Sequence, residues 1–419
     1  MTLVHSSSAT ALNISELVDL ICAFTHDPDA LHDLLSLSLV CRRFTSPAQT
    51  QLFHTLDLVT PLIKISFPKL LQTLSSHPHF LPHIRSIHAS LLSASERKIG
   101  VIGDRKPLAG NILDFLRTTP LPGLTHLELS NGAHIGMRAL DGGIILDVRN
   151  LLATLPITHL TLKTALAHPV DLDVLFGQCT PTLRTLTLGV NMLQDLCDGA
   201  PFKPADCVIQ NPSRRPQLQT LTLHDTTFRN PLENWLSQPP SRCPLDLRTL
   251  RTAKIMTAFN AEPKEFLDKG SFTLEDLEIS ATDLLNGPTI ANLTRLRRLV
   301  LTQGHLPQFI DILSALPHQL NHLETLALYW SDSAPDSAQL RMIDNIVADL
   351  SALRLTSFIV PIPWESELFV GGEEIFDFGI RTQLDGEEWK RIADVFPRMS
   401  MRGVLRVQCG DCFSGYDFD

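Results

Sequence analysis

The sequence has no dense block of Lys and Arg, and its 35 basic residues are outnumbered by 45 acidic ones, for a formal net charge of -10. Because nucleic-acid binding needs a concentrated basic surface, we expect no nucleic-acid partner. No run of about 18 apolar residues is present, so we expect no membrane-spanning helix. The N-terminal segment also lacks the basic start, apolar stretch and cleavage pattern of a signal peptide. We therefore expect an intracellular protein in the cytoplasm, the nucleus or both.

Motifs of catalysis and metal binding are scarce. The sequence has no nucleophile elbow, phosphate-binding loop or dinucleotide fingerprint. Four histidines lie in His77–His88, but Pro78 and Pro82 interrupt any regular face, so we interpret the segment as a surface loop and not a metal site. Cys409 and Cys412 form a single C-x-x-C, half of a zinc or redox site, for which we expect a structural role. We predict a non-catalytic protein with no metal and no cofactor.

A short leucine pattern recurs along the chain, as in LRTLTL, in about ten copies. The copies begin at Ile84, Leu124, Ile157, Leu183, Leu218, Leu247, Leu274, Leu296, Leu323 and Leu355. The last two apolar residues of a copy are two positions apart, so they point to one face of a strand. We expect Leu186 and Leu188 to face a core, and Thr185 and Thr187 to face solvent.

The segments between the copies have helical spacing of apolar residues, as in Leu306–Pro317 and Ser337–Leu350. Strands alternating with helices predict an α/β fold in which a parallel sheet and an outer layer of helices bury a shared core. Over roughly residues 80–360 the pattern resembles the leucine-rich-repeat superfamily, which implies a solenoid with the sheet on its concave side. The repeat pattern of this family, L-x-x-L-x-L-x-x-N, ends in an asparagine. One copy has it, as Asn191, and most others lack it, so we expect no continuous asparagine ladder.

Residues 12–58 differ from the repeats and are predicted to form three short helices. Asn13, with an acidic residue three positions later, opens the first, and Asp29 can cap the second. Ser46 followed by Pro47 is typical of the start of the third. So small a segment cannot bury all of its leucines. Some of them need a partner, which is either the rest of the chain or another protein.

The segments SELVDLICAF and DLLSLSLVCRRFTSPAQTQLF of this region resemble the F-box family, with Asn13 and Ile14 where that family usually has Leu-Pro. The resemblance implies that the helices bind a Skp-type adaptor, and through it a cullin, while the repeats select a target protein for ubiquitin transfer. The residues that we predict to dock the adaptor are Ile14, Leu17, Ile21, Leu34, Leu35 and Val40.

Two other functions stay open: a leucine-rich-repeat scaffold or binding protein whose N-terminal helices only cap the array, and an enzyme. An enzyme would show a concave pocket that gathers polar groups with perturbed pKa values.

Arg42 and Arg43 are interpreted as favourable charges at a helix C-terminus. The predicted organisation is a flexible N-terminus (1–11), an F-box-like helical domain (12–58), a repeat array (59–360) and a C-terminal cap with an acidic tail (361–419). In the cap, we expect a helix over Glu387–Ser400 and a strand within Met401–Gln408.

Overall fold

The structure of the chain is a computed structural model in which the chain forms two compact units. The first comprises Met1–Leu183 with Leu193–Arg214, and the second comprises Arg184–Met192 with Arg215–Asp419. The described residues are 31–40, 42–58, 63–91, 108–130, 140, 142–192, 215–224, 231–239, 242–256, 267, 273–285, 292–316, 320, 322–330, 337–350, 354–361 and 386–408.

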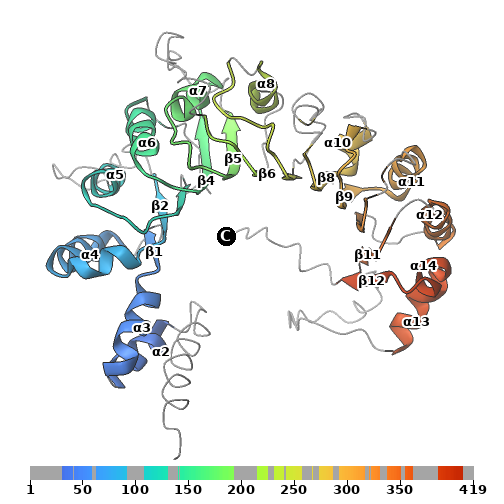
Figure 1. Cartoon of the computed structure of the whole chain (residues 1–419), viewed down its shortest axis with the longest axis horizontal. Helices are drawn as coiled ribbons and strands as arrows, with labels where there is room; N and C mark the ends of the chain where they lie inside the picture. Colours follow the sequence, from blue (N-terminus) through green and yellow to red (C-terminus); the bar gives the residue numbers. More distant parts are fainter. Residues whose placement is uncertain are drawn as a thin grey trace, which may run out of the picture. The chain divides into compact units, whose positions relative to one another are not determined.

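The first unit has two helices at its N-terminal end and then alternates strands with helices. Its elements are α2 (Leu31–Val40), α3 (Arg42–Leu52), β1 (Thr55–Leu58), α4 (Ile63–Ser76), η2 (Pro78–His83), β2 (Ser86–Ser90), α5 (Leu108–Thr118), β3 (His126–Ser130), α6 (Gly142–Thr154), β4 (His159–Leu166) and α7 (Val170–Phe176). Strands β1 to β4 pair in parallel in chain order. Figure 1 shows α4 to α7 on one side of these strands.

The second unit repeats the same alternation. Its elements are β5 (Thr185–Met192), β6 (Thr220–His224), α8 (Pro231–Ser237), β7 (Thr252–Met256), β8 (Asp276–Ser280), α10 (Ala281–Leu285), β9 (Arg298–Gly304), α11 (Leu306–Ala315), β10 (Thr325–Trp330), α12 (Ser337–Asp349), β11 (Ser357–Pro361), α13 (Gly386–Val395), α14 (Pro397–Met401) and β12 (Leu405–Gln408). Strands β5 to β12 also pair in parallel in chain order. The predicted α/β fold of parallel strands and helices is confirmed. Among the described residues, no helix has the length and apolar character that crossing a bilayer requires.

Alternate side chains of the strands form the core, as the leucine spacing predicts. Leu186 and Leu188 of β5 are buried, whereas Thr185 and Thr187 are partly exposed. The helices between the strands supply the other wall, and Phe309 of α11 is fully buried there. Because a fully buried Leu or Phe side chain contributes about 1.5 to 3 kcal/mol, this shared core is the main stabilisation of each unit.

A backbone hydrogen-bond pattern marks the start of each repeat. The carbonyl of Arg85, one residue before β2, accepts from the amides of Thr125 and His126, both at 2.9 Å. The carbonyl of Glu275, one residue before β8, likewise accepts from Arg297 and Arg298. Carbonyls that accept two amides in this way belong to His54, Arg85, Thr125, Arg184, Gln219, Arg251, Glu275, Arg297 and Glu324. The recurring leucine pattern of the sequence is therefore also a recurring backbone geometry.

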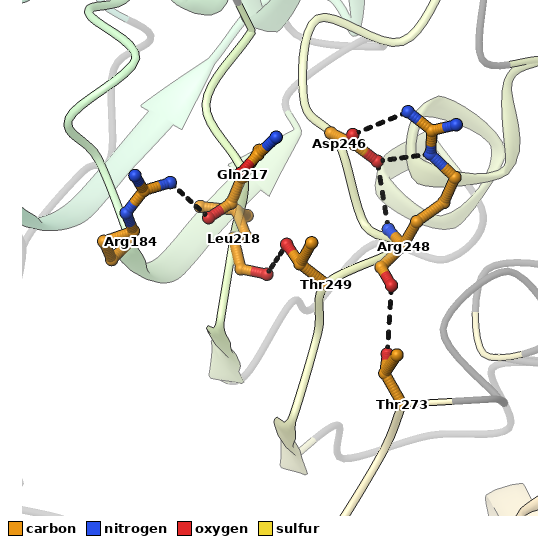
Figure 2. A network of polar contacts seen from close by, with 7 residues as sticks. All are labelled: Arg184, Gln217, Leu218, Asp246, Arg248, Thr249 and Thr273. Carbon is orange, nitrogen blue, oxygen red and sulfur yellow. Dashed lines mark hydrogen bonds and ion pairs between the residues drawn. The ribbon is translucent and has the colours of Figure 1, made fainter.

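No asparagine ladder was expected, and threonine hydroxyls bridge consecutive repeats instead. Thr249 donates to the carbonyl of Leu218 at 2.9 Å, and Thr273 donates to that of Leu250 at 2.7 Å. Figure 2 shows Thr249 with Leu218, and Thr273 beside the carbonyl of Arg248. Thr182 likewise donates to the carbonyl of Ile157. Thr125, Thr158 and Thr356 donate to carbonyls that also accept two backbone amides, those of Arg85, Thr125 and Glu324. The hydroxyls of Thr249, Thr273 and Thr182 thus supply a donor to carbonyls that lie outside the strands.

The N-terminal helices differ from the prediction in two respects. Arg42 and Arg43 were interpreted as charges at a helix C-terminus, but they are the first two residues of α3. A helix was expected to start at Ser46 and Pro47, but α3 starts at Arg42 and contains Pro47. The reason is tertiary packing: Phe44, Ala48 and Leu52 share one face of α3 and pack with Leu34 of α2. This contact outweighs the local cost of a proline, which removes one helical hydrogen bond.

The boundaries of the predicted domains also shift in detail. Strand β1 begins at Thr55, so the sheet starts within the segment 12–58 that was expected to be helical. In the predicted cap, helices α13 and α14 and strand β12 form, and β12 pairs in parallel with β11. Most of the segments Cys197–Pro216 and Trp330–Asp336, which interrupt the leucine pattern, lies outside the described residues, and Trp330 itself ends β10.

Candidate functional site

Helix α2 presents its leucines to two different sides. The side chain of Leu34 is only 4% exposed and packs in a small cluster with Ala48, Phe44 and Leu52 of α3. Although we predicted Leu34 to dock an adaptor, its position makes it a core residue of the helical pair. The exposed apolar surface of α2 therefore does not include Leu34.

Leu35 and Leu39 lie on the solvent side of the same helix. Their side chains are 49% and 86% exposed. Residues four apart fall on one face of a helix, so the two leucines form a continuous apolar edge, which we call the α2 edge. Leu35 was predicted as a docking residue and Leu39 was not, although their spacing could have indicated that they belong together.

The remaining predicted docking residues are not placed by the structure. Ile14, Leu17 and Ile21 lie outside the described residues, as does the side chain of Val40, the last residue of α2. The Cys409 and Cys412 pair also lies outside them. The α2 edge is thus the part of the predicted docking surface that the structure describes.

Helix α3 joins this helical pair to the first strands. The rings of Phe53 and Phe80 stack with centroids 4.2 Å apart and planes inclined by 14°. The carbonyl of His54 accepts hydrogen bonds from the amides of Arg85 and Ser86 at 2.9 and 3.0 Å. The hydroxyl of Thr50, on α3, also approaches η2. The C-terminal end of α3 is therefore fixed to the array.

The polar face of the second unit is dominated by ion pairs between adjacent strands. Lys254 of β7 lies 3.2 Å from Glu278 of β8, and Glu278 is almost fully buried. Asp276 of β8 and Arg298 of β9 are 3.0 Å apart. Because each charge has a partner of opposite sign in the neighbouring strand, this part of the face concentrates no charge of one sign.

A cavity of about 310 Å³ lies beside the starts of β8, β9 and β10. Its lining residues are Glu275, Arg295, Arg297, His322 and Glu324. The guanidinium of Arg297 donates two hydrogen bonds, of 3.1 and 2.6 Å, to one carboxylate oxygen of Glu324, and this contact raises the pKa of Arg297. With two carboxylates and two guanidinium groups, the cavity balances its own charges. We assign its side chains to holding the strand ends together.

The polar face of the first unit carries a pair of stacked histidines. The rings of His126 on β3 and His159 on β4 have centroids 3.9 Å apart and planes inclined by 13°. Each Nδ1 lies 2.8 Å from the hydroxyl of the preceding threonine, Thr125 or Thr158. Burial, and then the nearby histidines, lower the pKa of His126, and burial lowers that of His159. The copies LTHL and ITHL carry His at the same place, which was the available signal for this pair and was missed.

The histidines of segment His77–His88 do not converge. The His77 and His79 rings both pack against Phe80, with centroids 5.8 and 4.1 Å from it, and His83 lies 3.4 Å from the Thr50 hydroxyl. Across the part of the chain that the structure describes, no group of three or more His, Cys, Asp or Glu residues is placed to hold a metal ion. Pro78–His83 forms the short helix η2 where a loop was expected.

Comparison with known proteins adds no family: no protein-family model matches the chain, and no curated protein matches it significantly.

Proposed function

We propose that this chain is the substrate-recruiting subunit of a cullin-type (SCF) ubiquitin ligase. In this proposal α2 and α3 belong to an F-box-like domain that docks a Skp-type adaptor, and the parallel repeats are leucine-rich repeats that hold a target protein. The observation that carries the proposal is the α2 edge, where Leu35 and Leu39 are exposed while Leu34 packs inward.

The exposed leucines of the α2 edge favour association, because a partner that covers them removes apolar surface from water. Burying Leu39 completely against a partner contributes about 1.5 to 3 kcal/mol, and burying Leu35, which is already half-buried, contributes about half as much. Association costs at least about 4 kcal/mol of lost freedom, so two leucines do not suffice alone. The predicted docking residues Ile14, Leu17 and Ile21 are proposed to supply the rest. A handful of apolar anchor residues carries most of the binding energy of a typical protein interface.

The chain has a non-catalytic role in this proposal. The adaptor connects it to a cullin, ubiquitin transfer takes place elsewhere in the complex, and the repeats bring the target close. We propose the cytoplasm, the nucleus or both as its compartment.

The test is co-purification of the full chain with a Skp-type adaptor from cells that express both. Charges introduced on the α2 edge, as Leu35→Asp with Leu39→Asp, are expected to abolish recovery of the adaptor. Met342→Asp is the matched control, because Met342 of α12 is 50% exposed, like Leu35, but lies in the second unit. The proposal fails if the parent chain recovers no adaptor, or if the double variant recovers as much as the Met342→Asp control.

A second candidate function is a repeat scaffold whose N-terminal helices only cap the first strand. The stacking of Phe53 on Phe80 and the two hydrogen bonds to the His54 carbonyl favour it, because they make α3 continuous with the array. Capping of this kind shields the end of a repeat array from solvent. The scaffold predicts that Leu35 and Leu39 can be replaced by Asp without loss of any partner, so the same co-purification separates the two candidates.

A further inference from the structure

The histidine pair of the first unit has a defined hydrogen-bond direction. The hydroxyl of Thr125 lies 3.2 Å from the carbonyl of Arg85 and 2.8 Å from Nδ1 of His126. The hydroxyl of Thr158 has the same two contacts, with the carbonyl of Thr125 and with Nδ1 of His159. A hydroxyl has one proton, so both contacts are made only if it donates to the carbonyl and accepts from an Nδ1–H.

This arrangement sets the chemistry of the exposed ring edges. With the proton on Nδ1, the neutral imidazoles of His126 and His159 each keep a lone pair on Nε2, which accepts a hydrogen bond. The threonines hold both rings in place through the neighbouring backbone. The pair therefore presents two acceptors side by side on adjacent strands, already oriented before any ligand binds.

The residues around the pair make the surface rich in acceptors. Asp57, His88 and Glu128 occupy one row across β1, β2 and β3, next to the row that holds His126. The ammonium of Lys163, on β4, lies 3.1 Å from Glu128. The Glu128 carboxylate lies on the same face as the two Nε2 acceptors, so the surface suits a group that donates several hydrogen bonds.

We propose that the surface formed by His126, His159 and Glu128 binds an arginine side chain of a partner protein. The guanidinium would donate to the two Nε2 atoms and approach the carboxylate. Arginine fits better than lysine because its planar fork presents several N–H donors at once and is more weakly hydrated. The inference rests on the proposed function, in which the sheet holds a target protein, and it names a chemical feature of that target.

An acid-sensitive affinity follows from this geometry. A proton added to Nε2 of either histidine removes an acceptor and adds a positive charge beside the bound guanidinium. Asp57, His88, Glu128 and Lys163 are the other charged or titratable groups on this face of the strands. Arginine binding is therefore expected to weaken as the pH falls through the range in which histidine titrates.

The test is a titration of the full chain, labelled with ¹³C at histidine Cε1, with an end-blocked tri-arginine peptide followed by NMR. The resonances of His126 and His159 are assigned from the single variants His126→Phe and His159→Phe. We expect saturable shifts of these two resonances at pH 7.5. At pH 5.0 we expect an affinity lower by about tenfold, the factor that loss of one charged hydrogen bond produces.

Variants separate recognition from folding. The double variant His126→Phe/His159→Phe keeps two stacked rings and removes every ring nitrogen, so it should fold, by circular dichroism, and lose the peptide. His322→Phe, an exposed histidine of the second unit, should bind as the parent does. The inference is overturned if the double variant still binds, if the affinity is the same at both pH values, or if end-blocked tri-glutamate shifts the two resonances and tri-arginine does not. No adaptor takes part in this titration, so its failure is distinguishable from failure of adaptor docking.

Discussion

The carboxylate of Asp344 accepts a hydrogen bond of 2.9 Å from the backbone amide of Met399, 55 residues further along the chain. The same carboxylate accepts a second bond of 2.9 Å from the amide of Arg398. The first amides of a helix have no partner within it, so Asp344 of α12 caps α14 from outside. Because Asp344 is buried, this contact fastens the last helix to the array.

Replacing Asp344 with Ala is expected to lower the free energy of opening of α14 and β12 by about 1.5 to 3 kcal/mol, as for loss of hydrogen bonds to a charged group. Native-state hydrogen exchange of the amides of Leu405 and Val407 measures it. Asp349→Ala is the control: its ion pair with Arg398 is on the surface, so the loss should stay below about 1 kcal/mol. Equal effects of the two substitutions would contradict the capping role.

The threonine bridges between repeats make a second prediction. Thr249→Val keeps the shape of the side chain and removes the donor to the Leu218 carbonyl, so it should destabilise β6 and β7 by about 1 kcal/mol. Thr249→Ser keeps the donor and should recover most of that loss. Thr220→Val, on the polar face of β6, should be close to neutral. Hydrogen exchange at β6 and β7 compares the three, and a neutral Thr249→Val would show that the bridge adds no stability.

The histidine pair should make stability depend on pH. The pKa values of His126 and His159 are lowered in the folded chain, first by burial, so the unfolded chain binds protons more readily, near its ordinary pKa of about 6.5. The free energy of unfolding should therefore be unaffected above that value and fall as the pH drops through it. In the double variant His126→Phe/His159→Phe, urea denaturation between pH 7.5 and 5.0 should show a smaller decrease. If the free energy of unfolding of the double variant decreases as much as that of the parent chain, the two histidines are not the cause of the pH dependence.

Cys179 gives a chemical test of the core. Burial raises the pKa of its thiol to about 12, so almost none of it is thiolate near pH 8. Since the thiolate is the nucleophile, iodoacetamide should modify Cys179 only after unfolding. Peptide mass spectrometry of native and urea-treated protein measures the difference. Rapid modification of Cys179 in the native chain would show that this part of the core is open.

Local patterns of the sequence predicted the elements whose partners lie nearby in the chain. The two-residue spacing of Leu186 and Leu188 gave the buried face of β5, and the helical spacing in Leu306–Pro317 and Ser337–Leu350 predicted α11 and α12. In each case a short window contains the whole signal.

The site depended on contacts that a short window does not contain. Leu34 and Leu35 are adjacent leucines, and only the packing of Ala48 on α2 decides which of them is buried. The same packing overrides the start signal at Pro47. The stacking of His126 on His159 depends on the register between β3 and β4, which only a comparison of the two copies LTHL and ITHL indicates.

The central claim is that the α2 edge docks a Skp-type adaptor, and titration calorimetry of the purified full chain with that adaptor tests it most directly. We predict saturable binding by the parent chain and by Met342→Asp, and an affinity at least about thirtyfold lower for Leu35→Asp/Leu39→Asp. Burial of Leu39 and of the exposed half of Leu35 contributes about 2 to 4.5 kcal/mol together. Binding with the same affinity by the double variant, or no binding by the folded parent chain, would contradict the account.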